Sequence, residues 1–168
     1  MKRFIALVSA VVVGVTTLAA QNYMVVDSKK IFESYPAYTS AMETLNKEAQ
    51  SYQAQVDARF KIVETEYNNY MKVRATMSAA QQKQREGVIQ RLEDEATEYQ
   101  ESIFGEEGTL VQRQQSILEP IQKSVMSTID SYAKSSGFDL VLDSATSPSI
   151  LYRSERVERT AEVIKLLK

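Results

Sequence analysis

Two prolines and a serine divide the central part of this chain symmetrically. Pro36 and Pro120 bracket a long stretch that contains no other proline, and Ser78 lies at its midpoint. Because proline inside a helix removes a hydrogen bond and clashes with the preceding turn, helices tend to begin or end near it. The two halves are therefore expected to form two long helices of equal length joined by a tight turn. Such an antiparallel hairpin offers a large surface but no place for a buried catalytic pocket.

Residues in both halves recur at helical spacing. In the first half, steps of three and four connect Met42, Leu45, Ala49, Tyr52, Val56, Phe60, Val63, Tyr67, Tyr70, Arg74 and Met77. In the second half, the same steps connect Ile89, Leu92, Ala96, Tyr99, Ile103, Glu106, Leu110, Arg113 and Ile117. This period predicts a coiled-coil arm. Two consecutive steps of four around Val56 predict a local unwinding.

The tip of the hairpin is expected near residues 76–80. Ser78 followed by Gln81 matches a capping box, in which each side chain satisfies a free backbone N–H group at the start of a helix. Gly105 and Gly108 lie inside the predicted second helix, where each costs up to about 1 kcal/mol relative to alanine. They are either tolerated because the partner helix holds the segment, or they form a point at which the arm bends.

Residues 1–20 are typical of a secretory signal peptide. Two basic residues precede an apolar run at 4–13, and small residues follow it. This run is shorter than the roughly 20 residues that span a bilayer. We expect cleavage after Ala19 or Ala20, export from the cytoplasm and a soluble mature protein. No cysteine follows the cleavage position, so a lipid-anchored lipoprotein is not expected.

The composition argues against several classes of function. The chain contains no cysteine and no histidine, which removes thiol chemistry, disulfides and the commonest general base and metal ligand. Without the predicted signal peptide, 18 basic residues stand against 22 acidic residues, a net charge of −4. A nucleic-acid partner is therefore not expected, because it would require a basic face. We also expect no cofactor and no metal ion.

Carboxylate pairs in the second helix are the remaining basis for an enzyme. They are Glu93/Glu95, Glu98/Glu101 and Glu106/Glu107. Acid–base carboxylates work in a cleft that tunes their pKa values, whereas these are expected on exposed helix faces beside arginines. We interpret them as a solvated face and predict that the protein is not an enzyme.

Both ends of the chain are expected to form one small body, made of residues 21–36 and 120–168, with the arm at 37–119. At the N-terminal end, residues 22–26 favour a strand, and Asp27 and Ser28 can cap a short helix after it.

The C-terminal end supplies the rest of the predicted body. After Pro120, which either starts a helix or kinks one, the helix is expected to end at Gly137. Residues 138–143 and 150–152 favour strands, and Thr160 is expected to cap a last helix. Three short strands cannot close a core and leave an exposed edge, so several copies are expected to share their strands.

Four segments resemble the Skp/OmpH family of periplasmic chaperones. They are Tyr23–Phe32 with the following Pro36, Ile117–Ile121, Gly137–Asp143 and Thr160–Leu167. The resemblance implies a mainly helical homotrimer in which a β-rich body joins three subunits and three helical arms surround a cavity. It also implies a holdase that uses no nucleotide and binds unfolded outer-membrane β-barrel proteins. Family members are often basic, whereas this chain is acidic.

The resemblance and the heptads together suggest two sets of site residues. Subunit contacts in the body would involve Val25, Val26, Leu140, Val141, Leu142, Ile150 and Leu151. Candidate client contacts on the arm are Phe60, Tyr67, Tyr70, Met71, Met77, Tyr99 and Phe104. The heptad spacing predicts burial between the helices for Phe60, Tyr67, Tyr70 and Tyr99. Met71 and Phe104 lie one position past a seam residue and are expected to be partly exposed.

Two further interpretations remain open. An exported coiled-coil scaffold of the cell envelope would also explain the heptads, although not why the chain doubles back at Ser78. Lipopolysaccharide or a membrane surface could bind basic residues near the tip, which are Lys72, Arg74, Lys83 and Arg85.

Overall fold

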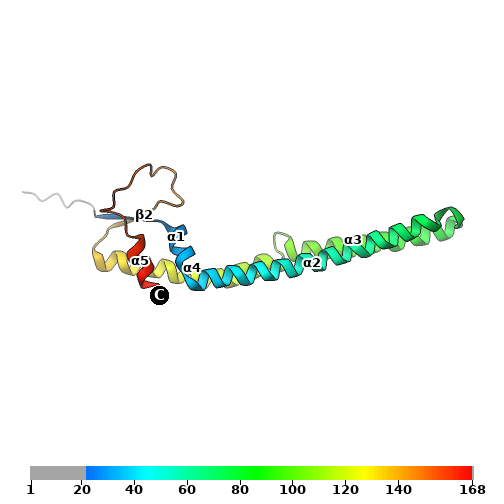
Figure 1. Cartoon of the computed structure of the whole chain (residues 1–168), viewed down its shortest axis with the longest axis horizontal. Coiled ribbons are helices and arrows are strands. Elements are labelled where there is room, and N and C mark those ends of the chain that lie inside the picture. The colour runs from blue at the N-terminus through cyan, green and yellow to red at the C-terminus, as the bar shows by residue number, and fades with distance from the viewer. Residues whose placement is uncertain (1–21, 168) are drawn as a thin grey trace, which may run out of the picture.

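The computed structural model describes residues 22–167, so the predicted signal peptide lies outside the described residues. Figure 1 shows a small body at one end and a long arm that projects from it. The elements in chain order are β1 (Tyr23–Val26), α1 (Ser28–Ser34), α2 (Pro36–Val73), a 3₁₀ turn (Arg74–Thr76), α3 (Ala79–Phe104), α4 (Thr109–Ser136), β2 (Leu140–Asp143) and α5 (Thr160–Leu166). The mainly helical class and the long hairpin predicted from the heptads are confirmed.

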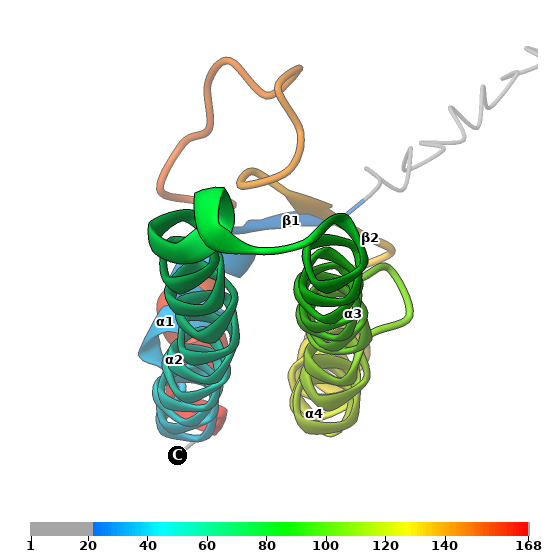
Figure 2. The same cartoon turned by 90° about the vertical axis from the view of Figure 1, so that its right-hand side faces the viewer.

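The arm consists of α2 on one side and α3 with α4 on the other. Pro36 occupies the first turn of α2, where its missing N–H group removes no helical hydrogen bond. The 38 residues of α2 span about 57 Å at about 1.5 Å per residue. Figure 2, viewed from the tip, shows α2 and α3 as adjacent columns. Within residues 22–167, no helix combines the length and the apolar character needed to cross a membrane.

The tip turn follows the predicted capping chemistry. The Ser78 hydroxyl accepts a hydrogen bond from the Gln81 backbone N–H at 3.3 Å, and the Gln81 side-chain oxygen accepts one from the Ser78 backbone at 2.9 Å. The capping box is therefore confirmed. A 3₁₀ turn at Arg74–Thr76 precedes it and brings the chain across to α3.

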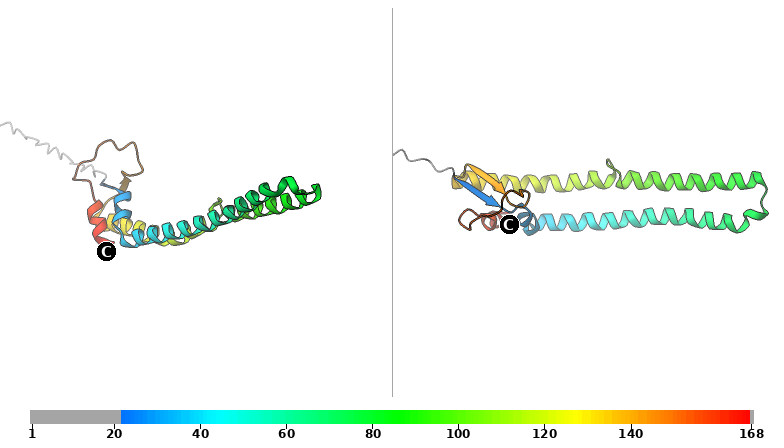
Figure 3. Two further views of the ribbon diagram at one scale, coloured as in Figure 1. Left: turned by 45° about the vertical axis from the view of Figure 1, so that its right-hand side comes forward. Right: turned by 90° about the horizontal axis from the view of Figure 1, so that it is seen from above.

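The second half of the arm is broken by a loop at residues 105–108, so the prediction of one continuous second helix was wrong, although the break falls at the two glycines singled out as a special point. The loop protrudes from the arm in Figure 3. A Cβ atom on Gly105 would lie 2.5 Å from the Glu101 carbonyl oxygen, and one on Gly108 would lie 2.5 Å from that of Ile103. Glycine is therefore required at both positions. Four residues amount to about one helical turn, so the apolar stripe resumes in nearly the same phase.

The helix α4 joins the arm to the body. Pro120 lies inside it, which supports the continuing-helix alternative. Gly137 ends α4 as predicted, with φ of 71°, a left-handed conformation that glycine adopts without strain.

The sheet of the body joins the two ends of the chain. β1 and β2 are parallel, with Tyr23 opposite Leu140 and Val26 opposite Asp143. Parallel neighbours need a long crossover connection, and here the entire arm supplies it. The core beneath the sheet is drawn from β1, α1, α4 and α5, and consists of Met24, Val26, Ile31, Val125, Ile129, Ala133, Val163 and Leu167.

The predicted strand at residues 150–152 is absent from the described structure. The Ile150 backbone instead folds back and donates to the Ser147 carbonyl at 3.1 Å. The second edge of β1 pairs with a later segment: Val25 donates to Val157 at 2.8 Å and accepts from Arg159 at 2.9 Å. Strand formation depends on a neighbouring strand more than on composition, and in this chain the β-formers at 150–152 have none beside them.

Of the two N-caps predicted for the short helices α1 and α5, the structure confirms one and contradicts the other. Asp27 caps α1 as predicted, since its carboxylate accepts from the Lys30 backbone at 3.1 Å. The prediction that Thr160 caps the last helix was wrong, because Thr160 is the first residue of α5. Its hydroxyl accepts from the Asp27 backbone at 2.8 Å and donates to Glu158. Thr160 thereby ties the C-terminal helix to the end of β1.

Candidate functional site

Polar side chains join the two sides of the arm along one flank. Three residues of α2 take part, at positions 48, 55 and 66. With 3.6 residues per turn, these positions lie along one side of α2. We call this flank the clasped face. From base to tip its pairs are Glu48 with Arg113 (3.1 Å), Gln55 with Tyr99 (2.8 Å) and Glu66 with Arg85 (3.4 Å).

The other flank carries exposed apolar side chains. Phe60, Tyr67 and Met71 follow one another on α2 at steps of seven and four, which places them on one side. A shallow groove of about 250 Å³ near the tip brings Tyr67 and Met71 beside Glu86, Gln90 and Glu93 of α3. Phe104 lies on the same side of α3, eleven residues after Glu93. We call the flank of Phe60, Tyr67, Met71 and Phe104 the apolar face.

Two of the predicted seam residues are exposed. Phe60 is 36% exposed and Tyr67 is 50% exposed, so the prediction that both are buried between the helices was wrong. The stutter expected at Val56 is not followed: from Val56 the seam continues in regular heptad steps through Arg59, Val63, Glu66 and Tyr70, and Phe60 and Tyr67 each lie one position past it. The Arg59 guanidinium lies 4.0 Å from the centre of the Tyr99 ring, a cation–π contact across the arm.

For the remaining candidate client contacts on the arm, the observed burial agrees better with the prediction. Met71 and Phe104 are exposed, which confirms the expectation from their place beside the seam. Tyr99 is half-buried, and Met77 is half-buried at the tip. A regular heptad continued past Val56, without the stutter, was the signal that could have identified Phe60 and Tyr67 as surface residues.

Tyr70 is buried and links α2 to α3. Its hydroxyl donates a hydrogen bond to the Glu86 carboxylate at 2.5 Å. This hydrogen bond, together with burial, raises the pKa of Tyr70 above its ordinary value of 10.0, so the hydroxyl remains a proton donor. Tyr70 is thus a structural link of the arm and is not available as an exposed contact.

The basic residues of the tip are only partly free. Arg85 pairs with Glu66, and the Arg74 guanidinium lies 6.0 Å from the centre of the Tyr70 ring. In the described part of the chain, Lys72 and Lys83 make no ion pair within 4.0 Å. Binding of lipopolysaccharide or a membrane surface at the tip stays a prediction.

The carboxylate pairs of the second half lie on exposed surfaces. Glu93, Glu98 and Glu101 face solvent, and Glu95 binds Arg91 at 2.6 Å. Glu106 and Glu107 belong to the loop between α3 and α4. Across residues 22–167, His, Cys, Asp and Glu side chains form no group of three that could hold a metal ion.

A groove of about 480 Å³ opens in the body between α4 and β2. Val26, Ile129 and Ala133 line it, and Met126 and Leu140 add partly exposed apolar surface. Among the described strands, β2 pairs with β1 alone, so the outer edge of β2 is open. The sequence did not reveal this groove because its walls come from a helix and a strand that meet only in the folded body.

The loop between β2 and α5, residues 144–159, presents the most exposed large apolar side chains of the body. Leu151 is 92% exposed and Tyr152 is 84% exposed. The other predicted body residues grade from buried to exposed. Val25 and Val26 are buried, Val141, Leu142 and Ile150 are half-buried, and Leu140 is exposed.

Asp143 fastens this loop to α1. Its carboxylate accepts hydrogen bonds from the Ser28 N–H at 3.0 Å, the Ser28 hydroxyl at 2.7 Å, the Ala145 N–H at 3.0 Å and the Thr146 hydroxyl at 2.7 Å. Burial alone would raise the pKa of Asp143, but these hydrogen bonds together outweigh it. The pKa therefore lies below its ordinary value of 3.8. The sequence analysis missed this role of Asp143.

Replacing Asp143 by asparagine is expected to lower the free energy of unfolding by about 1–3 kcal/mol at neutral pH, because charge-assisted hydrogen bonds are lost. Since the folded pKa is depressed, the contribution is complete above the unfolded pKa of about 3.9 and is lost as pH falls through the folded pKa. Urea unfolding of both proteins at several pH values measures the difference. A gap between them that stays constant down to about pH 2 would contradict this account.

A matched variant removes a single hydrogen-bond donor from the Asp143 carboxylate without changing the carboxylate itself. Thr146→Val removes one of the four hydrogen bonds and keeps the carboxylate, so its expected cost at neutral pH is about 0.5–1.5 kcal/mol. A loss as large as that of Asp143→Asn would show that the loop, not the carboxylate, carries the effect.

Comparisons with known proteins agree with this architecture. The model of the family described as "Outer membrane protein (OmpH-like)" matches residues 22–167. One solved structure with the same fold is a provisionally named OmpH-like outer membrane chaperone of Caulobacter crescentus CB15. Its TM-score is 0.71 at 13% sequence identity, and the match covers 89% of this chain and 85% of that one. No curated protein sequence matches the chain. Because the family model spans the whole body and arm, this chain belongs to the OmpH-like outer membrane protein family.

Proposed function

We propose that the protein is an ATP-independent periplasmic holdase, which binds unfolded outer-membrane β-barrel proteins between its arms and prevents their aggregation. The observation that carries this proposal is the apolar face of a long arm, where aromatic and methionine side chains remain exposed. Such side chains adapt to partners of different shape, which suits a client without fixed structure. The predicted signal peptide and the name given to the Caulobacter protein support the same function.

The client class follows from the chemistry of unfolded barrels. Their strands alternate apolar and polar residues and aggregate through exposed apolar edges. Each contact with an exposed side chain of the arm is weak. Several arms that hold one client would act together through a high effective concentration, without a deep pocket or an energy source.

The cavity requires several copies, and the body offers two complementary surfaces. The groove beside β2 is apolar with an open strand edge, whereas Leu151 and Tyr152 project from the loop as unpartnered apolar side chains. Asp130, Lys134 and Asp139 line the groove, with Lys134 paired with Asp130 at 2.8 Å, and Arg153 and Arg156 neighbour the projecting residues. We infer that the loop of one copy fills the groove of the next. A head-to-tail contact gives a ring when the rotation between copies closes, and the family resemblance implies a ring of three members.

Light scattering of a denatured barrel protein diluted from urea tests the holdase function. We expect the assembled protein to suppress scattering at near one trimer per client, with or without ATP, whereas an equal mass of lysozyme does not. Unchanged scattering would reject the holdase and favour the alternative of a structural coiled-coil scaffold of the cell envelope.

A further inference from the structure

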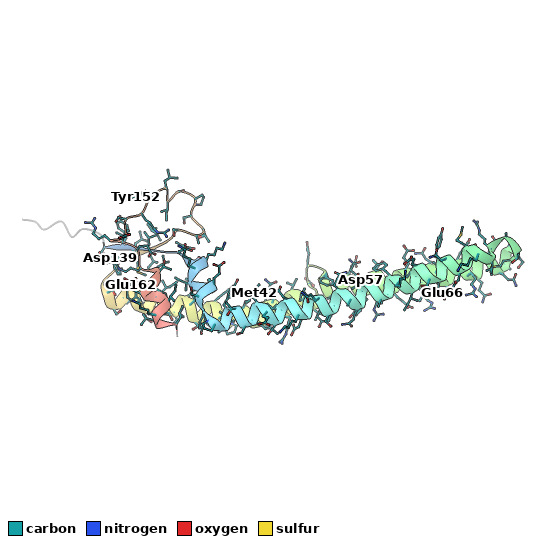
Figure 4. All side chains as sticks on the ribbon, in the orientation of Figure 1. Met42, Asp57, Glu66, Asp139, Tyr152 and Glu162 are labelled. Carbon is teal, nitrogen blue, oxygen red and sulfur yellow. The ribbon has the colours of Figure 1, made fainter. Side chains whose placement is uncertain are left out.

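The two faces of the arm differ in how their charges are arranged. On the clasped face, Glu48, Glu66 and Glu95 are each paired with an arginine, at 3.1, 3.4 and 2.6 Å. The carboxylates of that face are therefore already neutralised by the arm itself. Figure 4 labels Asp57 and Glu66, which lie nine residues apart and hence on opposite sides of α2.

The apolar face carries an excess of negative charge. Helical spacing places on it the cations Lys61, Lys72, Arg74 and Lys83 and the carboxylates Asp57, Glu64, Glu86, Glu93, Asp94 and Glu101, an excess of two negative charges. Lys61 binds Glu64 at 2.7 Å, and Glu86 accepts its hydrogen bond from Tyr70. Between residues 92 and 112 the second side of the arm contains no lysine or arginine. Glu93 and Glu101 face solvent and make no ion pair within 4.0 Å in the described part of the chain; Arg91, two residues before Glu93, is paired with Glu95, and Arg74 lines the same groove as Glu93.

A surface of this kind favours one type of occupant. Exposed apolar side chains attract apolar residues of a client, and unneutralised carboxylates attract cations and repel other carboxylates. Neighbouring side chains of a regular strand point to opposite sides, but an unfolded segment is not held in that conformation, and the long stems of lysine and arginine let the charged group reach the face that an adjacent apolar residue contacts. Charge complementarity therefore selects segments that combine apolar residues with lysine or arginine.

We propose that the arm holds its client on the apolar face alone, and that the carboxylates there select unfolded segments in which lysine or arginine alternates with apolar residues. This inference rests on the proposed holdase function and adds a face and a charge preference to it. The clasped face holds the helices together and does not bind the client.

Two labelled peptides of twelve residues test the charge preference by fluorescence anisotropy with the assembled protein. Both alternate leucine and tyrosine with polar residues; one carries four lysines and the other four glutamates at the same positions. The lysine peptide is expected to bind at least about tenfold more tightly at 25 mM salt, and its advantage shrinks at 300 mM because salt screens exposed charges. Equal affinity for the two peptides overturns the charge preference.

Matched charge variants locate the effect on one face. Glu93→Gln with Glu101→Gln is expected to weaken binding of the lysine peptide about three- to tenfold, since each exposed pair contributes a few-fold. Glu95→Gln with Glu98→Gln removes the same charge from the same helix but away from the apolar face, and a change of less than about twofold is expected. Equal losses in the two double variants would mean that net charge, not this face, attracts the peptide.

Matched apolar variants test the face itself. Tyr67→Ser with Met71→Ser is expected to weaken both peptides, whereas Ile62→Ser with Val73→Ser is not, although all four side chains are exposed. Circular dichroism checks that helix content is unchanged. A protein that suppresses barrel aggregation but shows no preference between faces refutes only this inference. A protein that neither binds peptides nor suppresses aggregation refutes the holdase as well.

Discussion

Replacing Leu140 by aspartate is expected to convert the assembled protein into folded monomers. Leu140 is 53% exposed in the single chain and lines the body groove, so aspartate there costs a monomer little. In the proposed assembly the same position is covered by the loop of a second copy, with Leu151 nearby. Burying a carboxylate against leucine costs several kcal/mol, which is enough to dissociate a modest interface. Light scattering coupled to size-exclusion chromatography measures the mass.

A control on the arm separates assembly from a general effect of charge. Ile62 is 54% exposed on α2, far from the body, and Ile62→Asp is expected to retain the mass of the parent protein. Circular dichroism should show the same helix content in both variants. If Leu140→Asp elutes with the mass of the parent, the groove is not a subunit contact, and a parent that is itself monomeric would reject the proposed ring.

Replacing Ile31 by alanine is expected to lower the free energy of unfolding of the body by about 2–5 kcal/mol. Ile31 is fully buried on α1 and packs in the cluster that contains Met24, Val125 and Val163. Removing its outer carbons leaves a cavity that the short elements around it cannot collapse to fill. Because small domains are stable by only about 5–15 kcal/mol, this loss is a large share of the total.

Ile31→Val is the matched control and is expected to cost about 0.5–1.5 kcal/mol. Urea unfolding followed by circular dichroism at a fixed protein concentration measures both variants, since association makes stability concentration-dependent. Equal losses for alanine and valine would show that Ile31 does not sit in a tightly packed core.

The hairpin was predictable because its determinants are local. Pro36 opens a helix, Ser78 and Gln81 cap the next one, and the steps of three and four residues require only neighbours on the same helix. The loop at Gly105 and Gly108 was not predictable in the same way. It removes about one turn and therefore leaves the apolar period of the sequence intact.

The sequence predicted which residues are candidates for client contact, but not which of them are exposed or on which flank of the arm they lie. Phe60 and Tyr67 were assigned to the seam by a stutter at Val56, whereas the structure continues the regular heptad past Val56 and leaves both residues on a flank. Which flank is clasped depends on Arg113, Arg85 and Tyr99 reaching across to α2. No single helix contains that information.

The sequence by itself determined the elements whose signals lie within a few residues of one another: the two sides of the arm, the tip, the cap at Asp27 and the end of α4 at Gly137. Only the tertiary structure decided which strands pair and which surfaces remain open. The β-formers at 150–152 form no strand because Val157–Arg159 occupies the edge of β1, and the groove beside β2 exists only where residues from distant parts of the chain meet. Helices are built from contacts within one segment, whereas sheet partners and grooves depend on chain segments separated by the length of the arm.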